Sequence, residues 1–238
     1  MTTTESGHEN TDPHQPLNPQ LGTLADLQIR KEQVRLLYRP SFSAAIASAF
    51  AAGFLAFMQW PAIDHNFILI WLGCMSLVVG ARALTFFIFF RADPDLHETK
   101  FWETLSITIA IFSAITWGSA GIFLFPDGDF ERQAGTIVIL TGMSAGAVTT
   151  LSALRRPVFI FLPSVMLPLT VHLFKEATEV TTSLAIMCVV YLVFLVFSAR
   201  HTYNAHLQNI TLRIKSRNEE QAHRKSEETA CKTSEILK

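Results

Sequence analysis

The sequence predicts an all-α polytopic membrane protein, and three observations favour this fold class. Hydrophobic residues make up 50% of the 238 residues and charged residues 16%, with a mean hydropathy of +0.31, whereas a soluble domain carries roughly 25% charged residues. Between residues 41 and 199, short polar breaks separate apolar segments of about the 20 residues that a helix needs to cross a bilayer. Basic residues gather in every second break.

Two elements precede the first apolar segment. Residues 1–22 are polar and contain three prolines, so we expect a disordered tail. Residues 23–40 repeat apolar side chains such as Val34 and Leu37 at near-helical spacing between basic residues. This pattern predicts a cytoplasmic amphipathic helix on a membrane face, ended by Pro40; a simple lead-in to the first span is the alternative. The N-terminus lacks the features of a cleaved signal peptide, so we expect the first span to be an uncleaved anchor.

Six membrane-spanning helices are expected next. The first is rich in small residues, and the second ends in a run of phenylalanines. The third is entered through Phe101 and Trp102, and the fourth carries two close glycines. The fifth contains two prolines, which would bend it, and the sixth has no charged residue. We place these helices at residues 41–59, 66–90, 103–125, 135–154, 157–174 and 181–199.

The distribution of basic residues predicts the orientation of the spans. Loops rich in lysine and arginine tend to stay in the cytoplasm. Basic residues precede the first span, follow the second and fourth, and follow the sixth at Arg200; the other three connections are poor in them. Six spans with both termini in the cytoplasm satisfy this pattern. The remaining loops are too short for an external ligand-binding domain, so a signal would be read within the bilayer or at its edges.

Residues 200–238 are expected to form a cytoplasmic signalling helix that continues the sixth span. The stretch contains no glycine or proline, and Leu207, Ile210 and Ile214 begin a coiled-coil seam that weakens further on. No helix-ending signal precedes Lys238. We therefore expect a helical linker that is truncated before an output domain.

No residue pattern indicates a catalytic or metal-binding site. The three cysteines have no metal-ligand spacing, and the histidines of the tail lack the sequence that surrounds a kinase phosphoacceptor. Residues 142–146 fit G-x-S-x-G, but a membrane helix cannot supply the strand-to-helix turn of a hydrolase. We expect no cofactor, and a net charge of −1 gives no reason to expect nucleic acid. Whether the full-length protein is an enzyme stays open.

Glycine pairs on the third and fourth spans are interpreted as helix-packing surfaces. Gly118 and Gly121 form one pair, and Gly142 and Gly146 form the other. Small residues at such spacing let two membrane helices approach closely.

Five residues are candidates for ligand binding or switching: Arg82, Glu103, Trp117, His172 and Tyr191. Arg82 lies about two turns inside the cytoplasmic end of the second span, where a charge costs roughly 2.5–3.5 kcal/mol on insertion scales. It would pair with Glu103, contact a ligand, or snorkel to the interface. His172 would titrate near neutrality or be an ordinary interfacial histidine. Trp117 and Tyr191 would line a pocket for an apolar ligand or pack in the core.

The layout as a whole resembles a known family, the N-terminal integral-membrane sensor region of bacterial signalling proteins. In that family the membrane block precedes a histidine kinase or a diguanylate cyclase, often with a PAS domain between them. The resemblance covers residues 28–238. It rests on Arg-Leu-Leu-Tyr-Arg before the first span, Trp117-Gly118 in the third, Gly-Met-Ser-Ala-Gly-Ala-Val in the fourth, Arg156-Pro157 before the fifth, and Ala199-Arg200 followed by a polar helix with Leu212-Arg213.

The resemblance implies a sensory function. The chain would be the input module of a receptor in the bacterial inner membrane, acting as a homodimer within the lipid bilayer. It would bind an unknown small or apolar ligand and relay a signal from the membrane or its periplasmic edge, through the sixth span, to a kinase or cyclase domain in cis. The rival hypothesis is a self-contained small transporter or channel, which predicts internal repeats and polar residues converging at mid-membrane. The sequence shows no clear repeat.

Overall fold

The regular elements of the protein are all helices within the part that the computed structural model describes, residues 32–92, 98–126 and 128–236. Six helices are long and apolar enough to cross a membrane. The chain is therefore an all-α polytopic membrane protein, as predicted. The predicted tail and residues 23–31 of the predicted amphipathic helix lie outside the described residues. The long helices are α2 (Ser41–Gln59), α3 (His65–Ala92), α4 (Thr99–Phe123), α5 (Phe130–Leu151), α6 (Arg155–Glu176) and α7 (Glu179–Ile236).

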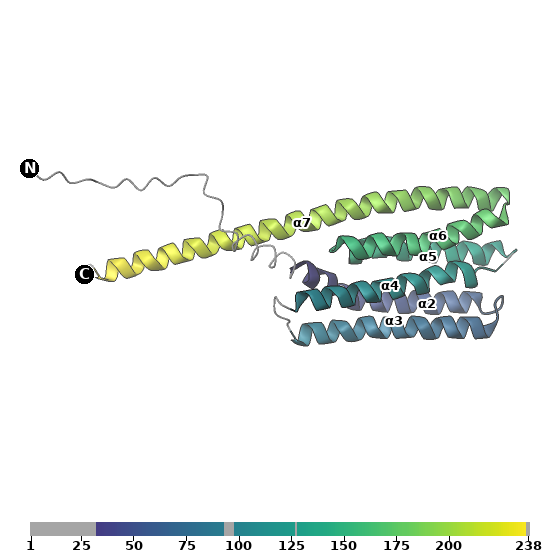
Figure 1. Ribbon diagram of the computed structural model, residues 1–238, viewed down its shortest axis with the longest axis horizontal. Helices are drawn as coiled ribbons and strands as arrows, with labels where there is room; N and C mark the ends of the chain where they lie inside the picture. Colours follow the sequence, from purple (N-terminus) through teal and green to yellow (C-terminus); the bar gives the residue numbers. More distant parts are fainter. Residues whose placement is uncertain (1–31, 93–97, 127, 237–238) are drawn as a thin grey trace, which may run out of the picture.

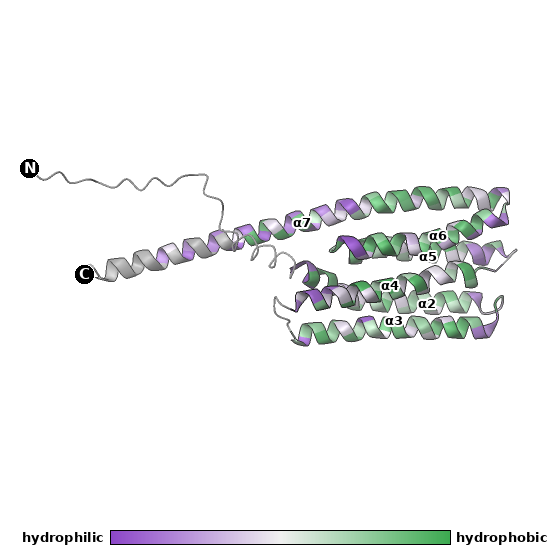
Figure 2. Ribbon diagram, in the orientation of Figure 1, coloured by the Kyte–Doolittle hydropathy of each residue, from purple (hydrophilic) through white to green (hydrophobic). Residues whose placement is uncertain are grey.

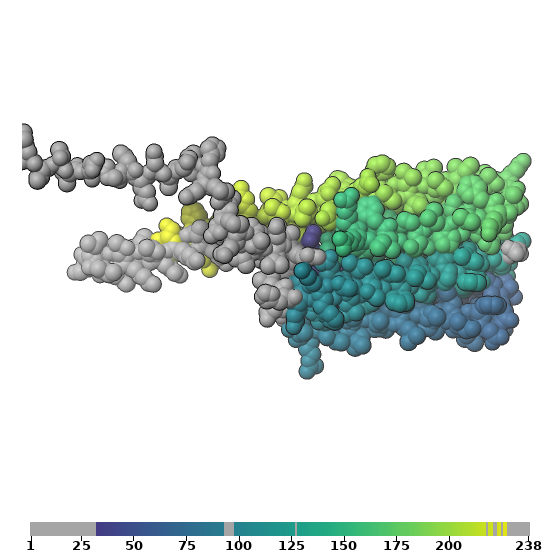
Figure 3. Space-filling model, in the orientation of Figure 1, coloured from purple at the N-terminus to yellow at the C-terminus, as the bar shows by residue number. Residues whose placement is uncertain are grey.

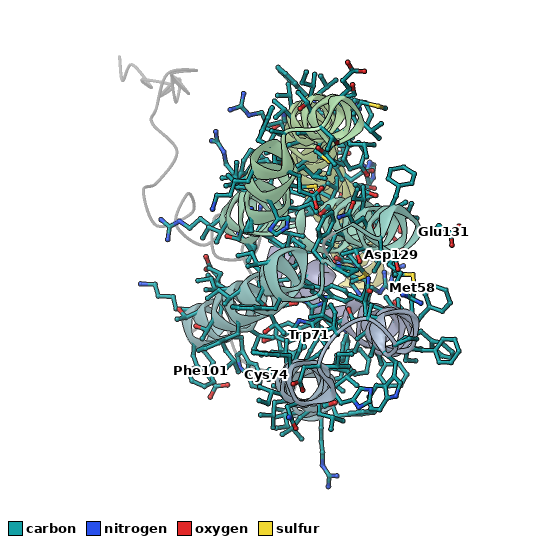
Figure 4. The ribbon with its side chains drawn as sticks, turned by 90° about the vertical axis from the view of Figure 1, so that its right-hand side faces the viewer. Met58, Trp71, Cys74, Phe101, Asp129 and Glu131 are labelled. Atoms are coloured by element: carbon teal, nitrogen blue, oxygen red, sulfur yellow. The ribbon has the colours of Figure 1, made fainter. Side chains whose placement is uncertain are left out.

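The helices run up and down in one bundle (Figure 1). Viewed along its axis, the bundle has two staggered rows, with α3, α4 and α6 in one and α2, α5 and α7 in the other (Figure 4). Half of the most apolar window of α6 is buried inside the bundle, against 17% for α3 and 22% for α7. Thus α6 lies inside the bundle, while α3 and α7 lie at its two edges and expose most of their surface to lipid.

The two ends of the bundle differ in charge, and Figure 2 shows the polar residues gathered at both ends of an apolar middle. We call the end at which α2 begins the basic end and the opposite one the acidic end. Arginine and lysine side chains at the basic end are Arg35, Arg39, Arg91, Lys100, Arg155, Arg156 and Arg200. Carboxylates at the acidic end are Asp64, Asp129, Glu131, Glu176 and Glu179.

The predicted sixth span and the predicted C-terminal helix form a single helix. Helix α7 runs without a break from Glu179 to Ile236, 58 residues, or about 87 Å at 1.5 Å per residue. Its first part packs on α5 and α6, and the rest extends beyond the basic end (Figures 1 and 3). Since no helix breaker interrupts residues 200–236, the backbone has no reason to stop where the apolar residues stop.

Residues 32–38 form a short helix that packs against the basic end of the bundle. The Tyr38 ring stacks on Phe89 of α3 at 4.2 Å between centroids, and its hydroxyl donates a 3.2 Å hydrogen bond to the Trp102 carbonyl of α4. Val34 and Leu37 are buried as well. The sequence predicted that this apolar face would lie on a membrane surface. In the structure, its described part lies on protein.

Candidate functional site

A cavity of about 350 Å³ lies in the basic half of the bundle, where α2 and α5 face each other. Its wall comes mainly from small residues of these two helices, with Arg82 of α3, Ser113 of α4 and Phe161 of α6 completing it. Along its rim, Ser43, Gly142 and other small residues are exposed. The cavity therefore opens sideways, between two membrane-spanning helices.

The cavity exists because both facing helices carry side chains too small to fill the space between them. A Cβ atom built on Gly142 or Gly146 would meet nothing within 4 Å. Within the single chain, this glycine pair therefore makes no close helix contact of the kind that the sequence suggested. The pair instead forms the α5 side of the cavity.

The other glycine pair, on α4, lies at a close contact with α6. A Cβ on Gly118 would overlap the carbonyl oxygen of Ser164, and one on Gly121 would lie 3.1–3.3 Å from Leu169. In a regular helix the Ser164 carbonyl would accept a hydrogen bond from residue 168, but Pro168 has no N–H. The missing side chain of Gly118 thus lets α4 pack directly on the carbonyl that Pro168 leaves unpaired.

Arg82 is the one ionisable residue among those that line the cavity in the described part of the chain. It also lines a second, smaller pocket of about 20 Å³, which Tyr38 lines as well. The ion pairs of the described residues do not include one between Arg82 and Glu103. Glu103 is buried, at 9% exposure, and makes contacts of its own. The cost of a charge at this depth, roughly 2.5–3.5 kcal/mol, is thus not offset by a carboxylate of the described chain.

Two serine hydroxyls complement Arg82 in the cavity wall. Ser48 and Ser113 are 4% and 3% exposed, and neither donates a hydrogen bond to another described residue. The hydroxyls of Thr149 and Thr150 are already used, because both donate to the Gly146 carbonyl at 2.8 and 3.0 Å. The wall therefore offers a guanidinium and two hydroxyl donors to whatever fills the cavity.

Tyr191 connects α7 to the helix that forms the cavity wall. Its hydroxyl donates a 3.1 Å hydrogen bond to the carbonyl of Thr141, the residue before Gly142. One turn of α5 thus faces the cavity on one side and α7 on the other. Tyr191 does not line the cavity itself, so the sequence hypothesis of a Tyr191 pocket wall does not apply to this space.

The remaining sequence candidates lie elsewhere in the bundle. Trp117 is fully buried, and its ring meets Trp71 edge-on at 5.7 Å; its indole N–H has no partner among the described residues. His172 packs against Phe125 at 4.9 Å and lines a separate surface groove beside Pro168 in the acidic half. The structure therefore does not bring the five candidates together.

A polar network that sequence reasoning missed lies at the acidic end. Gln59 of α2 is fully buried. Its amide N–H groups donate a 2.7 Å hydrogen bond to the Thr136 hydroxyl and a 3.2 Å hydrogen bond to the Arg132 carbonyl of α5. Gln133 donates to Glu176 of α6 at 2.6 Å and to the Pro126 carbonyl at 2.9 Å. The only sign of this network in the sequence was Gln59, an amide side chain at the end of an otherwise apolar span. These bonds join α2, α5 and α6.

Asp129 and Arg132 complete this closure of the acidic end. The Asp129 carboxylate caps α5 by accepting a 3.2 Å bond from the Arg132 N–H, and it pairs with the Arg132 guanidinium at 2.7 Å. The same guanidinium donates a 3.2 Å hydrogen bond to the Met58 carbonyl of α2. Figure 4 looks at this end: Met58 and Asp129 lie beside each other, while Glu131 points away from the bundle.

The serine of the G-x-S-x-G pattern forms a hydrogen bond within its own helix. Ser144 of that pattern is buried, and its hydroxyl donates a 2.8 Å hydrogen bond to the Leu140 carbonyl. No group of three or more His, Cys, Asp or Glu side chains able to hold a metal occurs in the part of the chain that the structure describes.

Comparisons of the chain with protein-family models, with curated proteins and with solved structures found no match.

Proposed function

We propose that the chain is the transmembrane sensory module of a bacterial receptor, placed in the inner membrane with both termini in the cytoplasm. The observation that carries this proposal is the continuity of α7, which contacts the cavity-forming helix through Tyr191 and then extends far beyond the bundle. A rigid helix with one end in the bundle and the other free suits the relay of small displacements to a kinase or cyclase domain in cis.

The route of the relay starts at the cavity. A ligand bound against Gly142 and Gly146 would hold or displace the adjacent turns of α5. The Tyr191–Thr141 hydrogen bond would carry that shift to α7, which packs on α5 and α6 at the edge of the bundle. The ligand must bind the two packings with different affinity, and a difference of about 1–3 kcal/mol is typical of such coupling.

A fusion series tests the relay without knowledge of the ligand. Residues 1–236 are joined to a diguanylate cyclase catalytic domain, with one to seven helix-forming residues inserted at the junction. If α7 transmits rotation or tilt, cyclase activity should rise and fall with the period of about 3.6 residues per helical turn. Activity that is flat across the series would overturn the relay.

A matched pair of tyrosine variants tests the proposed route. Tyr191→Phe removes the hydroxyl that bonds Thr141, whereas Tyr203→Phe makes the same change on α7 beyond Arg200. We expect cyclase output to change at least threefold in the first variant and to stay within experimental error in the second. Equal outputs from both variants would argue against transmission through Tyr191.

The homodimer is tested by cysteine crosslinking along residues 207–214. Ile210 is 2% exposed in the single chain and Leu212 is 66% exposed, so a contact between copies should crosslink Leu212→Cys more readily than Ile210→Cys. Absence of crosslinks at every position of this stretch would contradict the dimeric relay.

The second candidate is a small transporter, which the cavity favours because the half-buried Arg82 in its wall suits an anionic substrate. Flux of a labelled anion into proteoliposomes, abolished by Arg82→Gln, would support it. A chain without flux but with a periodic fusion series would be a sensor.

A further inference from the structure

We propose that the cavity between α2 and α5 binds the anionic head group of a phospholipid that enters from the membrane leaflet at the basic end. This inference extends the proposed function by naming a ligand class for its site. It rests on that function only where the bound lipid is taken as the signal; the binding itself is independent of any relay.

The charge of the cavity wall points to an anion. Arg82 has no ion-pair partner among the described residues, and no acidic residue lines the cavity in that part of the chain. Ser48 and Ser113 add two buried hydroxyls that donate to no described residue. A phosphate presents several acceptor oxygens and a negative charge, which complement one guanidinium and two hydroxyl donors.

The position of the opening points to the lipid as the source of that anion. The rim residues Ser43, Gly142, Gly146 and Thr149 are exposed on the outer side of membrane-spanning helices. Arg82 lies ten residues before the end of α3 at Ala92, about 15 Å along the helix. Ser43 lies in the first turn of α2 and Thr149 in the last turn of α5, so the opening runs along the side of the bundle up to the level of the basic end, where the head groups of that leaflet lie.

The cavity has room for a head group, whereas the pocket beside it does not. That second pocket shares Arg82 and Thr150 with the cavity, is also lined by Tyr38, and measures about 20 Å³, which is room for about one water molecule. The cavity itself, at about 350 Å³, is at the small end of ligand sites. It therefore suits a head group whose acyl chains stay outside, against exposed apolar residues of α2 and α5 such as Ile46 and Val138.

Native mass spectrometry of the full chain in a neutral detergent tests the proposal. Phosphatidylglycerol and phosphatidylcholine with identical acyl chains are titrated separately, and the apparent Kd is read from the lipid-bound fraction. We expect the wild-type chain to bind one phosphatidylglycerol at least tenfold more tightly than phosphatidylcholine. Equal affinity for the two lipids would overturn the proposal.

Three variants locate the binding site. Arg82→Gln should weaken phosphatidylglycerol binding at least tenfold, whereas Arg91→Gln, which removes an exposed charge in the last turn of the same helix, should change it less than twofold. Gly146→Leu should weaken binding by filling the cavity, since a side chain has room there, and it leaves Arg82 in place. Loss of binding in Arg91→Gln alone, or unchanged binding in both cavity variants, would overturn the site.

A competition arm separates the lipid from a soluble anion. Glycerol phosphate, which is the head group without chains, should not displace the lipid at a hundredfold excess. Displacement at concentrations equal to the lipid's would mean that the anion comes from water and would overturn the lipid source. The fusion series reads the relay separately, so a periodic series with no lipid selectivity would reject this ligand and retain the sensor.

Discussion

In the acidic half of the bundle several buried polar side chains hydrogen-bond across helices, whereas in the basic half Arg82 and two serines face an open space. Gln133 and Glu176 pair directly across α5 and α6, and Gln59 donates two hydrogen bonds to α5. On the same two helices α2 and α5, the cavity begins where such side chains give way to alanine, serine and glycine.

This difference has a mechanical consequence. Helices tied by several hydrogen bonds at one end and separated by a cavity at the other can move most where the cavity lies. The acidic end would then act as the fixed point, and the basic end, from which α7 emerges, as the moving one.

The largest expected difference in stability is between a side chain added at a close helix contact and one added in the cavity. Gly118→Val places a side chain on the Ser164 carbonyl, a backbone atom that cannot move aside, and should destabilise the bundle by about 3 kcal/mol, as over-packed cores do. The Cβ atom of Gly146→Val would meet nothing within 4 Å, and its methyl groups would lie in the cavity, so this substitution should change the stability little. Thermal unfolding in detergent measures both. Equal losses would mean that the cavity is closed in the protein.

Next is the removal of a polar partner from each half. Gln133→Leu takes two donors from the acidic-end network and leaves the Glu176 carboxylate without its 2.6 Å partner, which should cost about 2 kcal/mol. Ser113→Ala removes a hydroxyl that bonds no described residue and should cost less than 0.5 kcal/mol, within the range of minor substitutions. A reversed order, read from the same unfolding curves, would contradict the idea of a fixed acidic end.

Arg82→Met should have a smaller effect of the opposite sign. The substitution removes a cation that has no carboxylate partner among the described residues while preserving much of its apolar stem. In delipidated detergent solution we expect a gain of about 1 kcal/mol. A loss of several degrees in the unfolding midpoint would show that the protein itself pairs Arg82.

The smallest effect is expected at the link between α5 and α7. Tyr191→Phe removes one hydrogen bond to the Thr141 carbonyl and should cost about 0.5 kcal/mol, at the low end for a hydrogen bond because the site is only partly buried. Hydrogen exchange should show faster opening of α7 near residue 191 and unchanged exchange at the acidic end. Uniformly faster exchange across all helices would indicate that the bond supports the whole bundle, not a local connection.

Much of the architecture could be predicted from the sequence, because the helix pattern depends on local composition. The first span was placed at residues 41–59 and matches α2. The other boundaries fell within a few residues of the observed helices, and the helix expected after residue 199 is the continuation of the sixth span. Hydropathy marks where a helix crosses lipid but gives no reason for the backbone to end there.

The candidate site could be predicted only in part. Arg82 stood out because a charge is rare within a span, and the glycine pairs stood out by their spacing. The sequence could not distinguish the two pairs, since Gly118 and Gly142 have similar neighbours along the chain. The difference arises from what faces them: the Ser164 carbonyl on α6 for one, and nothing within 4 Å for the other.

The sequence alone thus determined the number of spans, their order and the charge difference between the two ends, because each of these follows from the solvent that a residue prefers. Only the tertiary structure decided which small residues pack and which enclose a cavity. It also decided which polar groups pair, and that Tyr191 meets the α5 turn beside Gly142. These are contacts between residues far apart in the chain, and they depend on how each helix is rotated about its axis, which a weakly amphipathic membrane helix does not reveal.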